Sequence, residues 1–425
     1  MPHAHQPRRG TRALDAMNFF LADVRDGLGP YLAIYLVSVR GPTHGWNEAS
    51  AGLVMTIAGI AGLIANAPAG ALVDRSKAKR AILVAAALAV TLASLALPLS
   101  HGFLAVTAGQ SLAAMAAAAF APGIAAISLG IVGPKAFTAR VGRNEAFNHA
   151  GNAVAAALAG VLAWRFGPVV VFWLMAGLAA LSIVAILSVD GSAIDHAVAR
   201  GCADDEEAQE RDGPPQSLRQ VLMGTPALGI FALACFLFHL ANAAMLPTVG
   251  QLLGREVGSS QATSLTAACI VGAQLVMVPV AVLVGRYADR WGHRPILLAG
   301  LAVLALRGLL YPLSNAPAWL LFVQLLDGIG AGIFGALLPV VVAAIMRGTG
   351  RFNVAQGAVA TVQGLGGALS TTLAGAVIVG LGYTAAFLTL AVVAVVGLVL
   401  VAWKMPETAE KADAESNRRQ RFEQR

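Results

Sequence analysis

The chain has 425 residues, of which 57% are hydrophobic and only 12% are charged. Soluble domains carry about 25% charged residues, so this composition excludes an ordinary soluble domain and indicates a membrane protein. The net charge of +7 would also fit a nucleic-acid-binding protein, but the distribution of the basic residues, described below, argues against that class.

The N-terminal region is polar and then apolar. Residues 1–13 are polar and basic, and we expect them to form a cytoplasmic tail. The apolar segment that follows contains Asp23, Arg25 and Asp26. Because a cleavable signal peptide has an uncharged core, we predict that this segment is retained as the first membrane helix.

Apolar runs long enough to cross a bilayer follow one another along the chain, since about 20 helical residues span the hydrocarbon core. We predict an all-α membrane protein with twelve transmembrane helices in two six-helix bundles related by pseudo-symmetry. Most segments between the spans are short, so neighbouring helices must be antiparallel. The predicted spans are residues 14–39, 47–72, 81–99, 103–131, 146–166, 168–189, 226–252, 261–284, 295–314, 317–345, 354–381 and 383–404.

One segment between the spans is longer and more polar than the others. Residues 190–225 are rich in acidic residues and contain the pair Pro214-Pro215. We predict that this segment is a solvated cytoplasmic linker. It would separate an N-terminal bundle at 14–189 from a C-terminal bundle at 226–404, with a cytoplasmic tail at 405–425.

Basic residues are concentrated on one side of the predicted spans. Most of the 29 Lys and Arg residues lie in the two tails, the linker and every second loop. On the opposite side we place only Arg40, Arg165 and Arg255. The positive-inside rule therefore predicts a bacterial cytoplasmic (inner) membrane protein with both termini in the cytoplasm, and the basic charge indicates topology rather than nucleic-acid binding.

The two halves of the sequence repeat each other. After the second predicted span, Gly70 and Asp74 each lie 215 residues before Gly285 and Asp289, which follow the eighth. The same offset relates Ala159-Gly160 to Ala374-Gly375, Gly167 to Gly382, and Phe172 to Phe387. A constant offset over such distances implies two structurally equivalent bundles.

The loop after the eighth span carries a resemblance to a known family. Its sequence, Gly285-Arg-Tyr-Ala-Asp-Arg-Trp-Gly-His-Arg294, matches the signature G-x-x-x-D-R-x-G-x-[RK] of the major facilitator superfamily. The first copy, which begins at Gly70, has Lys77 at the second glycine position. From about residue 14 to 404 the chain therefore resembles this superfamily, and the resemblance implies a twelve-helix secondary transporter similar to bacterial members.

The resemblance also implies a role for both loop copies, which is to hold the two halves together on the cytoplasmic side in one conformation. Glycine permits a tight turn, and an aspartate at a helix end can accept N–H groups from a neighbouring helix N-terminus. The alternative is a solvated basic turn. The predicted cytoplasmic gate motif consists of Gly70, Asp74, Arg75, Gly285, Asp289, Arg290, Gly292 and Arg294.

Two departures weaken an assignment to the drug–proton antiporters of this superfamily. Many of those antiporters carry an arginine in the fourth helix, where this chain has Thr107 and Gln110. They also share a Gly-Pro pair in the fifth helix, which is missing between Gly151 and Gly160.

Charged residues within the predicted spans form the first candidate site. Each costs about 2.5–3.5 kcal/mol on insertion scales, so each is a functional candidate. Asp26 lies about 18 Å from the start of the first helix, near the membrane midplane, and Asp23 shares its face. A partly desolvated carboxylate binds a proton more readily. Asp23, Arg25 and Asp26 are therefore predicted to bind protons or substrate, and a structural Asp–Arg pair is the alternative.

The seventh span contributes a second group, His239 and Asn242. The repeat places these residues opposite Asp23 and Asp26. Histidine changes charge near neutral pH, so His239 is a candidate for the transport pathway. A buried histidine with a purely structural role is the alternative.

A third group joins the ninth and tenth spans. Arg307 lies roughly 18 Å from the inner start of its helix, and Asp327 lies roughly 15 Å from the outer start of the next. In a membrane about 30 Å thick these depths nearly coincide, so we predict an Arg307–Asp327 pair with either a functional or a structural role.

The start of the fifth span contributes polar candidates for lining the pathway, namely Asn148, His149 and Asn152. Gln274, Gln324 and Gln363 are weaker candidates.

Secondary active transport is the predicted function. No G-x-x-x-x-G-K-[ST] phosphate loop is present, which argues against ATP-driven transport by this chain. The intramembrane carboxylates favour protons as the coupling ion, and we favour export of a small organic solute over uptake of a nutrient or metal chelate. A membrane enzyme or a receptor is a remote alternative. We expect a monomer with no cofactor, no metal site and no catalytic residues, whose partners are substrate, protons and membrane lipids.

Overall fold

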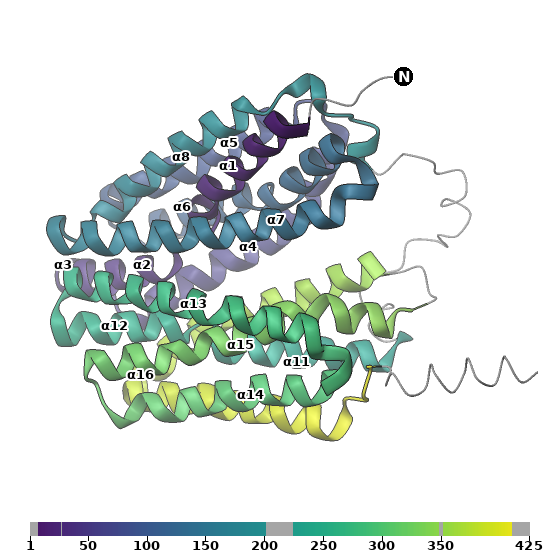
Figure 1. Cartoon of the computed structure of the whole chain (residues 1–425). Coiled ribbons are helices and arrows are strands. Elements are labelled where there is room, and N and C mark those ends of the chain that lie inside the picture. The colour runs from purple at the N-terminus through teal and green to yellow at the C-terminus, as the bar shows by residue number, and fades with distance from the viewer. Residues whose placement is uncertain (1–6, 27, 201–223, 348–351, 410–425) are drawn as a thin grey trace, which may run out of the picture. The chain divides into compact units, whose positions relative to one another are not determined.

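The computed structural model describes residues 7–26, 28–200, 224–347 and 352–409 (Figure 1). Every regular element among these residues is helical, as the composition predicts. The α-helices are α1 (Pro7–Asp26), α2 (Gly29–Ile34), α3 (Gly41–His44), α4 (Glu48–Arg75), α5 (Lys79–Ala96), α6 (Phe103–Ala117), α7 (Phe120–Phe166), α8 (Val170–Ser188), α11 (Pro226–Asn242), α12 (Met245–Val257), α13 (Ser259–Trp291), α14 (His293–Leu310), α15 (Pro317–Ile345) and α16 (Phe352–Lys404).

Ten helical segments of the described chain are long and apolar enough to cross a membrane. The last of them, Val354–Lys404, is 51 residues long and contains a non-helical residue, Gly382, with φ 86° and ψ 174°. Gly167, at the end of α7, has nearly the same conformation, with φ 84° and ψ 170°. A positive φ favours glycine. The chain therefore turns at equivalent points of both halves, whereas the total of twelve spans stays a prediction.

The first predicted span, residues 14–39, is interrupted. α1 ends at Asp26, α2 begins at Gly29, and a π-helix covers Tyr35–Arg40. Pro30 lies in the first turn of α2, where its missing N–H is tolerated but a helix arriving from the N-terminal side cannot continue. This interrupted segment is not among the ten candidate spans.

Contacts divide the chain into two compact units. The first consists of Met1–Gln209 with Gly250–Val271, and the second of Glu210–Val249 with Gly272–Arg425. In the first unit, the Ser264 hydroxyl on α13 donates to the carbonyl of Gly160 on α7 at 2.7 Å. The contact-based unit thus adds residues 250–271 to the N-terminal helices, while the bundle bounds predicted from the repeat remain a prediction.

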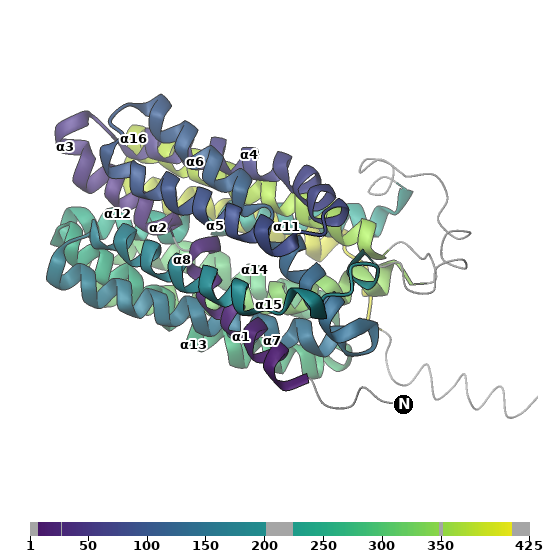
Figure 2. The same ribbon diagram turned by 90° about the horizontal axis from the view of Figure 1, so that it is seen from above.

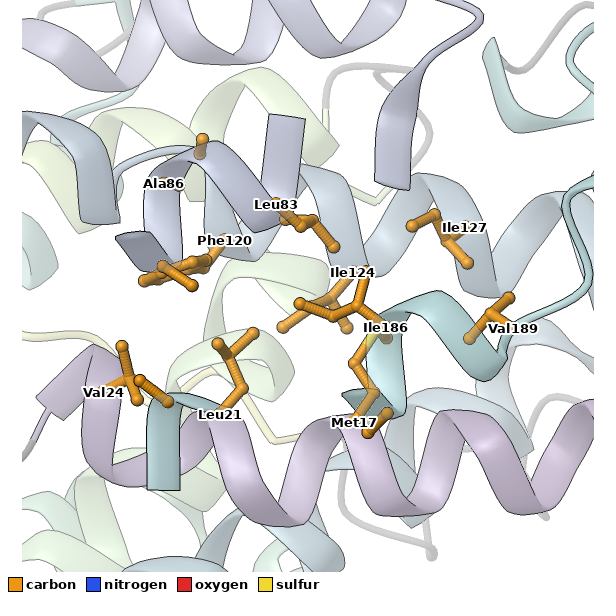
Figure 3. Packing of buried hydrophobic residues seen from close by; sticks show 14 of the residues in the cluster. Met17, Leu21, Val24, Leu83, Ala86, Phe120, Ile124, Ile127, Ile186 and Val189 are labelled. Carbon is orange, nitrogen blue, oxygen red and sulfur yellow. The ribbon is translucent and has the colours of Figure 1, made fainter. Parts of the chain in front are cut away.

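The core of the first unit forms where α1 packs against α7 and α8 (Figure 2 and Figure 3). Met17 and Leu21 of α1 meet Phe120 and Ile124 of α7 and Ile186 of α8. Each of these side chains is at most 8% exposed. Burying such a side chain contributes about 1.5–3 kcal/mol, so this cluster fixes the position of the interrupted first helix. In the second unit, α11 and α14 pack against α16.

The beginning of the predicted linker is packed rather than solvated. Ile194 and Ala199 are 6% and 4% exposed, and the Asp195 backbone N–H donates to the carbonyl of Gly130 on α7 at 3.0 Å. Two apolar residues in a polar stretch are too few to produce a recognisable sequence pattern, which explains why the prediction missed this segment. Residues 201–223 of the predicted linker lie outside the described residues.

Two glycines separated by the repeat offset sit at close helix crossings. A Cβ atom on Gly151 of α7 would lie 2.0 Å from the carbonyl oxygen of Phe19 on α1. A Cβ on Gly366 of α16 would lie 2.3 Å from the carbonyl oxygen of Phe236 on α11. Real Cβ atoms do not approach backbone so closely, so glycine is required where the first and fifth helices of each half cross.

We expect Gly151→Ala and Gly366→Ala each to destabilise the protein by about 1–3 kcal/mol, because the added methyl group must push two backbones apart. Thermal unfolding of the purified protein in detergent measures the effect. Gly142→Ala and Gly357→Ala are matched controls, since both positions are helical, 215 residues apart and open within 4 Å. These controls should be neutral or stabilising by up to about 1 kcal/mol. Equal melting temperatures for all four variants would contradict the described crossings.

Candidate functional site

Arg307 on α14 is only 1% exposed. Its Nη1 donates to the carboxylate of Asp327 on α15 and to Oδ1 of Asn242 on α11, the latter at 2.6 Å. The predicted Arg307–Asp327 pair is therefore confirmed, and Asn242, which was predicted in a separate group, joins it. A buried guanidinium needs a counter-charge and hydrogen-bond acceptors. One side chain thus ties together three helices of the second unit (Figure 1).

Two neutral side chains complete this group, called here the Arg307 cluster. The Tyr311 hydroxyl donates to Oε1 of Gln324, and Nε2 of Gln324 donates to Oδ2 of Asp327 at 3.1 Å. The Arg307 guanidinium carbon lies 5.8 Å from the centre of the Tyr311 ring. The Asp327 side chain is 18% exposed, compared with 2% for Arg307. Asp327 is therefore the charged member that an exchanging proton can reach more easily.

His239 precedes Asn242 by three residues on α11. Its Nδ1 lies 2.9 Å from the carbonyl oxygen of Cys235, and its ring meets the edge of Phe238. Because a carbonyl only accepts hydrogen bonds, the proton belongs on Nδ1, and Nε2 of the neutral ring is free to accept one. This geometry suits a proton carrier but equally suits a structural histidine.

The first predicted group is described only in part. Asp23 is half-buried in the last turn of α1 and interacts electrostatically with Tyr31 of α2. The side chains of Arg25 and Asp26 lie outside the described residues. Asp23 therefore stands beside the interruption of the first helix, while the predicted roles of Arg25 and Asp26 stay predictions.

A cavity of about 200 Å³ lies beside this interruption. Its lining comes from the first helix region together with α4, α5, α6 and α8, and it is mostly apolar. Gln110 contributes one of the few polar side chains; it is 8% exposed, and its Nε2 has no hydrogen-bond partner among the described residues. Drug-sized ligands occupy roughly 300–1,000 Å³. The cavity is therefore large enough for an apolar portion of a small solute, with one N–H available to it.

The polar residues predicted at the start of the fifth span lie on α7. Asn148 is 5% exposed and Asn152 is half-buried. Nδ1 of His149 is buried and has no partner within the described part of the chain. The Oε1 atoms of Gln274 and Gln363 are in the same condition, whereas Gln324 is satisfied within the Arg307 cluster. These side chains have hydrogen-bonding capacity to offer, and their place in a transport pathway stays a prediction.

The sequence analysis missed a second buried charge network, called here the Asp15 network. Asp15 of α1 accepts hydrogen bonds from Nη2 of Arg140, at 2.5 Å, and from Nε and Nη2 of Arg143, at 2.9 and 2.7 Å. Arg140 Nε also donates to Asn144 Oδ1 at 2.7 Å, and Asn18 donates to the same oxygen at 3.0 Å. The side chains of Asp15 and Arg140 are 8% and 4% exposed. The network therefore binds α1 to the middle of α7.

Part of the predicted gate motif can be described. Asp74 and Arg75 are exposed at the end of α4, and Asp289 is exposed with its carboxylate 3.4 Å from Nε2 of His293. Contact between the two halves through these aspartates stays a prediction. Arg294 has a local role as well, because its Nη2 donates to the carbonyl of Ala402 near the end of α16.

The segment after α16 adds a carboxylate at the same place. Glu407 accepts the backbone N–H of His293 at 2.8 Å and that of Arg294 at 3.3 Å, which caps the start of α14. Burial raises the pKa of Glu407, but these and neighbouring N–H donors lower it by more, so its pKa lies below the usual range. Glu407 thus remains ionised at neutral pH and holds the end of the second repeat to its third helix.

Comparison with protein families gives one match over nearly the whole chain. The model of the Major Facilitator Superfamily matches residues 14–229 and 231–424. An uncharacterised MFS-type transporter of Mycobacterium tuberculosis, Rv2456c, is 52% identical over 404 residues, which cover 95% of each chain. A further transporter of this type from the same organism, Rv1250, is 31% identical over 144 residues, or 33% of this chain.

Solved transporter structures share the fold. The nucleoside transporter NupG, in a mutant form, has a TM-score of 0.73 and 16% identity, covering 93% of this chain and 100% of its own. A POT family transporter in complex with 5-aminolevulinic acid also has a TM-score of 0.73, with 13% identity over 93% of this chain and 95% of its own. At these identities the likeness concerns the fold.

Proposed function

The chain belongs to the Major Facilitator Superfamily and is a multi-pass membrane transporter rather than an enzyme, and on this basis we propose that it is a proton-coupled secondary active transporter of a small organic solute. Transport proceeds by alternating access, in which the two halves rock around a site near the membrane midplane. Both termini face the cytoplasm, in keeping with the concentration of basic residues in the tails and linker.

The Arg307 cluster is the observation that carries this proposal. An ion pair inside membrane helices is costly to keep, and such residues commonly mark substrate or proton pathways. Arg307 stays protonated at all relevant pH values, so the exchangeable proton belongs to Asp327. Protonation of Asp327 would weaken its hold on Arg307 and release a guanidinium for other acceptors. Asn242 already shares Nη1 of Arg307, so α11 responds to the same event.

The substrate chemistry follows from the cavity beside the first helix. Its lining is mostly apolar, with Gln110 as a hydrogen-bond donor. A small amphipathic compound with an acceptor atom matches this combination. Such compounds partition into membranes, which favours export over uptake. Uptake of a nutrient or metal chelate is the second candidate, supported by the unsatisfied amides of Gln274 and Gln363, which suit a more polar solute.

Growth of a deletion strain across a panel of toxic amphipathic compounds, carbon sources and iron sources distinguishes these candidates. Sensitivity to toxins that is reversed by the restored gene supports export. A growth defect confined to one carbon or iron source supports uptake. An absence of any difference in either direction, together with no flux of the panel compounds in proteoliposomes, argues against the transport proposal.

We expect Asp23→Asn to uncouple transport from protons, because an amide beside the interrupted first helix cannot take up and release a proton. The measurement is substrate-dependent acidification of proteoliposomes loaded with a pH-sensitive dye. Proton flux should fall to the level of empty liposomes, while counterflow exchange of substrate continues. The exposed Asp190→Asn variant is the control and should retain proton flux. Unchanged proton flux in Asp23→Asn would exclude this carboxylate as the coupling site.

A further inference from the structure

An open cavity of about 490 Å³ lies in the first unit, between the start of α5 and the segment that follows α8. Lys77, Arg80 and His196 contribute basic side chains to its lining. Most of the remaining lining is apolar and includes Leu88 and Leu187. The cavity therefore combines a cationic end with an apolar side, and none of the transport residues named above lines it.

Arg80 is held in place at the cationic end. Its Nη1 donates to the carbonyls of Leu187 and Val189, at 3.4 and 2.5 Å, at the C-terminal end of α8. Its Nη2 lies against Gly191, where a Cβ atom would come within 2.4 Å of it. These contacts fix the guanidinium at the mouth of the cavity, while Nη2 retains donor capacity.

The carboxylate nearest to this arginine is already engaged. Asp190 accepts hydrogen bonds from the backbone N–H and the hydroxyl of Ser192, at 2.9 and 2.7 Å. The Ser192 hydrogen bonds, with a smaller effect of Arg80, hold the pKa of Asp190 below its usual range. Asp190 therefore stays ionised but is turned toward its own cap. Lys77 is exposed and adds a second positive charge.

The apolar side of the cavity faces outward along two membrane helices. α5 and α8 are both candidate membrane spans, and Leu88 and Leu187 are 47% and 58% exposed. Exposed leucines on a membrane helix contact acyl chains. The basic residues lie at the start of α5 and the apolar residues follow within three turns, which is the order of headgroup and acyl chain in a lipid.

We propose that this cavity binds an anionic glycerophospholipid, with Lys77 and Arg80 contacting the lipid phosphate and Leu88 and Leu187 packing against an acyl chain. With the orientation proposed above, the lipid belongs to the cytoplasmic leaflet. Charge complementarity selects an anionic over a zwitterionic headgroup, because a basic residue near a membrane surface contributes about 1 kcal/mol toward anionic lipid, or about fivefold in affinity. The apolar side selects a lipid over free phosphate.

The test compares lipid retention by the purified full-length protein, using native mass spectrometry with phosphatidylglycerol and phosphatidylcholine as probes. Wild type should retain phosphatidylglycerol preferentially, and Lys77→Gln should lower that retention about fivefold. Leu88→Asn should lower it as well, because the acyl chain loses its apolar contact. Lys404→Gln is the matched control: this lysine is exposed at the end of α16 and does not line the cavity, so retention should be unchanged.

Three outcomes would overturn the proposal. Equal retention of the two lipids would exclude a headgroup site, and equal loss in Lys77→Gln and Lys404→Gln would indicate general surface charge. Displacement of the lipid by millimolar inorganic phosphate, with no effect of Leu88→Asn, would indicate a phosphate site instead. Melting temperatures of all variants verify folding. Transport activity is not the readout, so failure of the transport proposal leaves this test intact.

Discussion

Replacing Arg307 with alanine, or Asp327 with asparagine, is expected to abolish transport and to lower stability by about 3–5 kcal/mol, because each change removes one partner of a buried ion pair. The Arg307 side chain is 2% exposed and cannot reach water when its counter-charge is lost. Asp327→Asn preserves shape, so its cost reports charge rather than packing. Substrate counterflow and the melting temperature in detergent are the two measurements.

The exchanged variant, Arg307→Asp with Asp327→Arg, separates pairing from position. If mutual attraction dominates, the double variant recovers part of the stability lost by the single ones. Transport should remain lost, because Asn242 and Gln324 are placed for the native order of charges. Arg165→Gln, on an exposed arginine at the end of α7, is the control and should change stability by less than about 1 kcal/mol. Normal transport by Asp327→Asn would remove the Arg307 cluster from the proposed mechanism.

Asp15→Asn is expected to produce the second large effect, a loss of about 3–5 kcal/mol in stability, because Arg140 is buried and would keep its charge without a carboxylate. The contrast with Arg143 makes the experiment specific. Both arginines bind Asp15, but the Arg143 side chain is 58% exposed, compared with 4% for Arg140. Arg143→Gln should therefore cost no more than about 1 kcal/mol.

Thermal unfolding of the variants in detergent measures this prediction. The double variant Asp15→Asn with Arg140→Gln should be more stable than Asp15→Asn alone, because no buried charge remains unpaired. Equal losses for Asp15→Asn and Arg143→Gln would show that the network acts at a solvated surface, which its described burial does not allow.

Sequence reasoning located the Arg307–Asp327 pair because two regular helices convert residue number into depth. It did not join Asn242 to that pair, since the facing of α11 toward α14 depends on packing that no spacing encodes. The Asp15 network was missed for another reason. Arg140 and Arg143 served only as evidence for topology, and Asp15 stood at the edge of a predicted span, where a charge needs no special explanation.

The repeat was the most informative sequence feature. The offset of 215 residues relates the matching conformations of Gly167 and Gly382, and it also relates Gly151 to Gly366 at the helix crossings. The interruption of the first helix has no such signal in the other half, where α11 runs unbroken from Pro226 to Asn242. Departures from the repeat cannot be located by comparing the halves alone, because a difference in sequence does not say which half has changed its backbone.

The weakly apolar, interrupted first helix has a consequence for biosynthesis. It leaves the ribosome before α7 does, yet the buried partner of its Asp15 is Arg140, 125 positions later in the chain. The nascent first helix therefore lacks its counter-charge until α7 has been synthesised. We expect its stable insertion at the translocon to be delayed until that point, so that truncated chains ending before Arg140 leave it exposed to quality-control proteases.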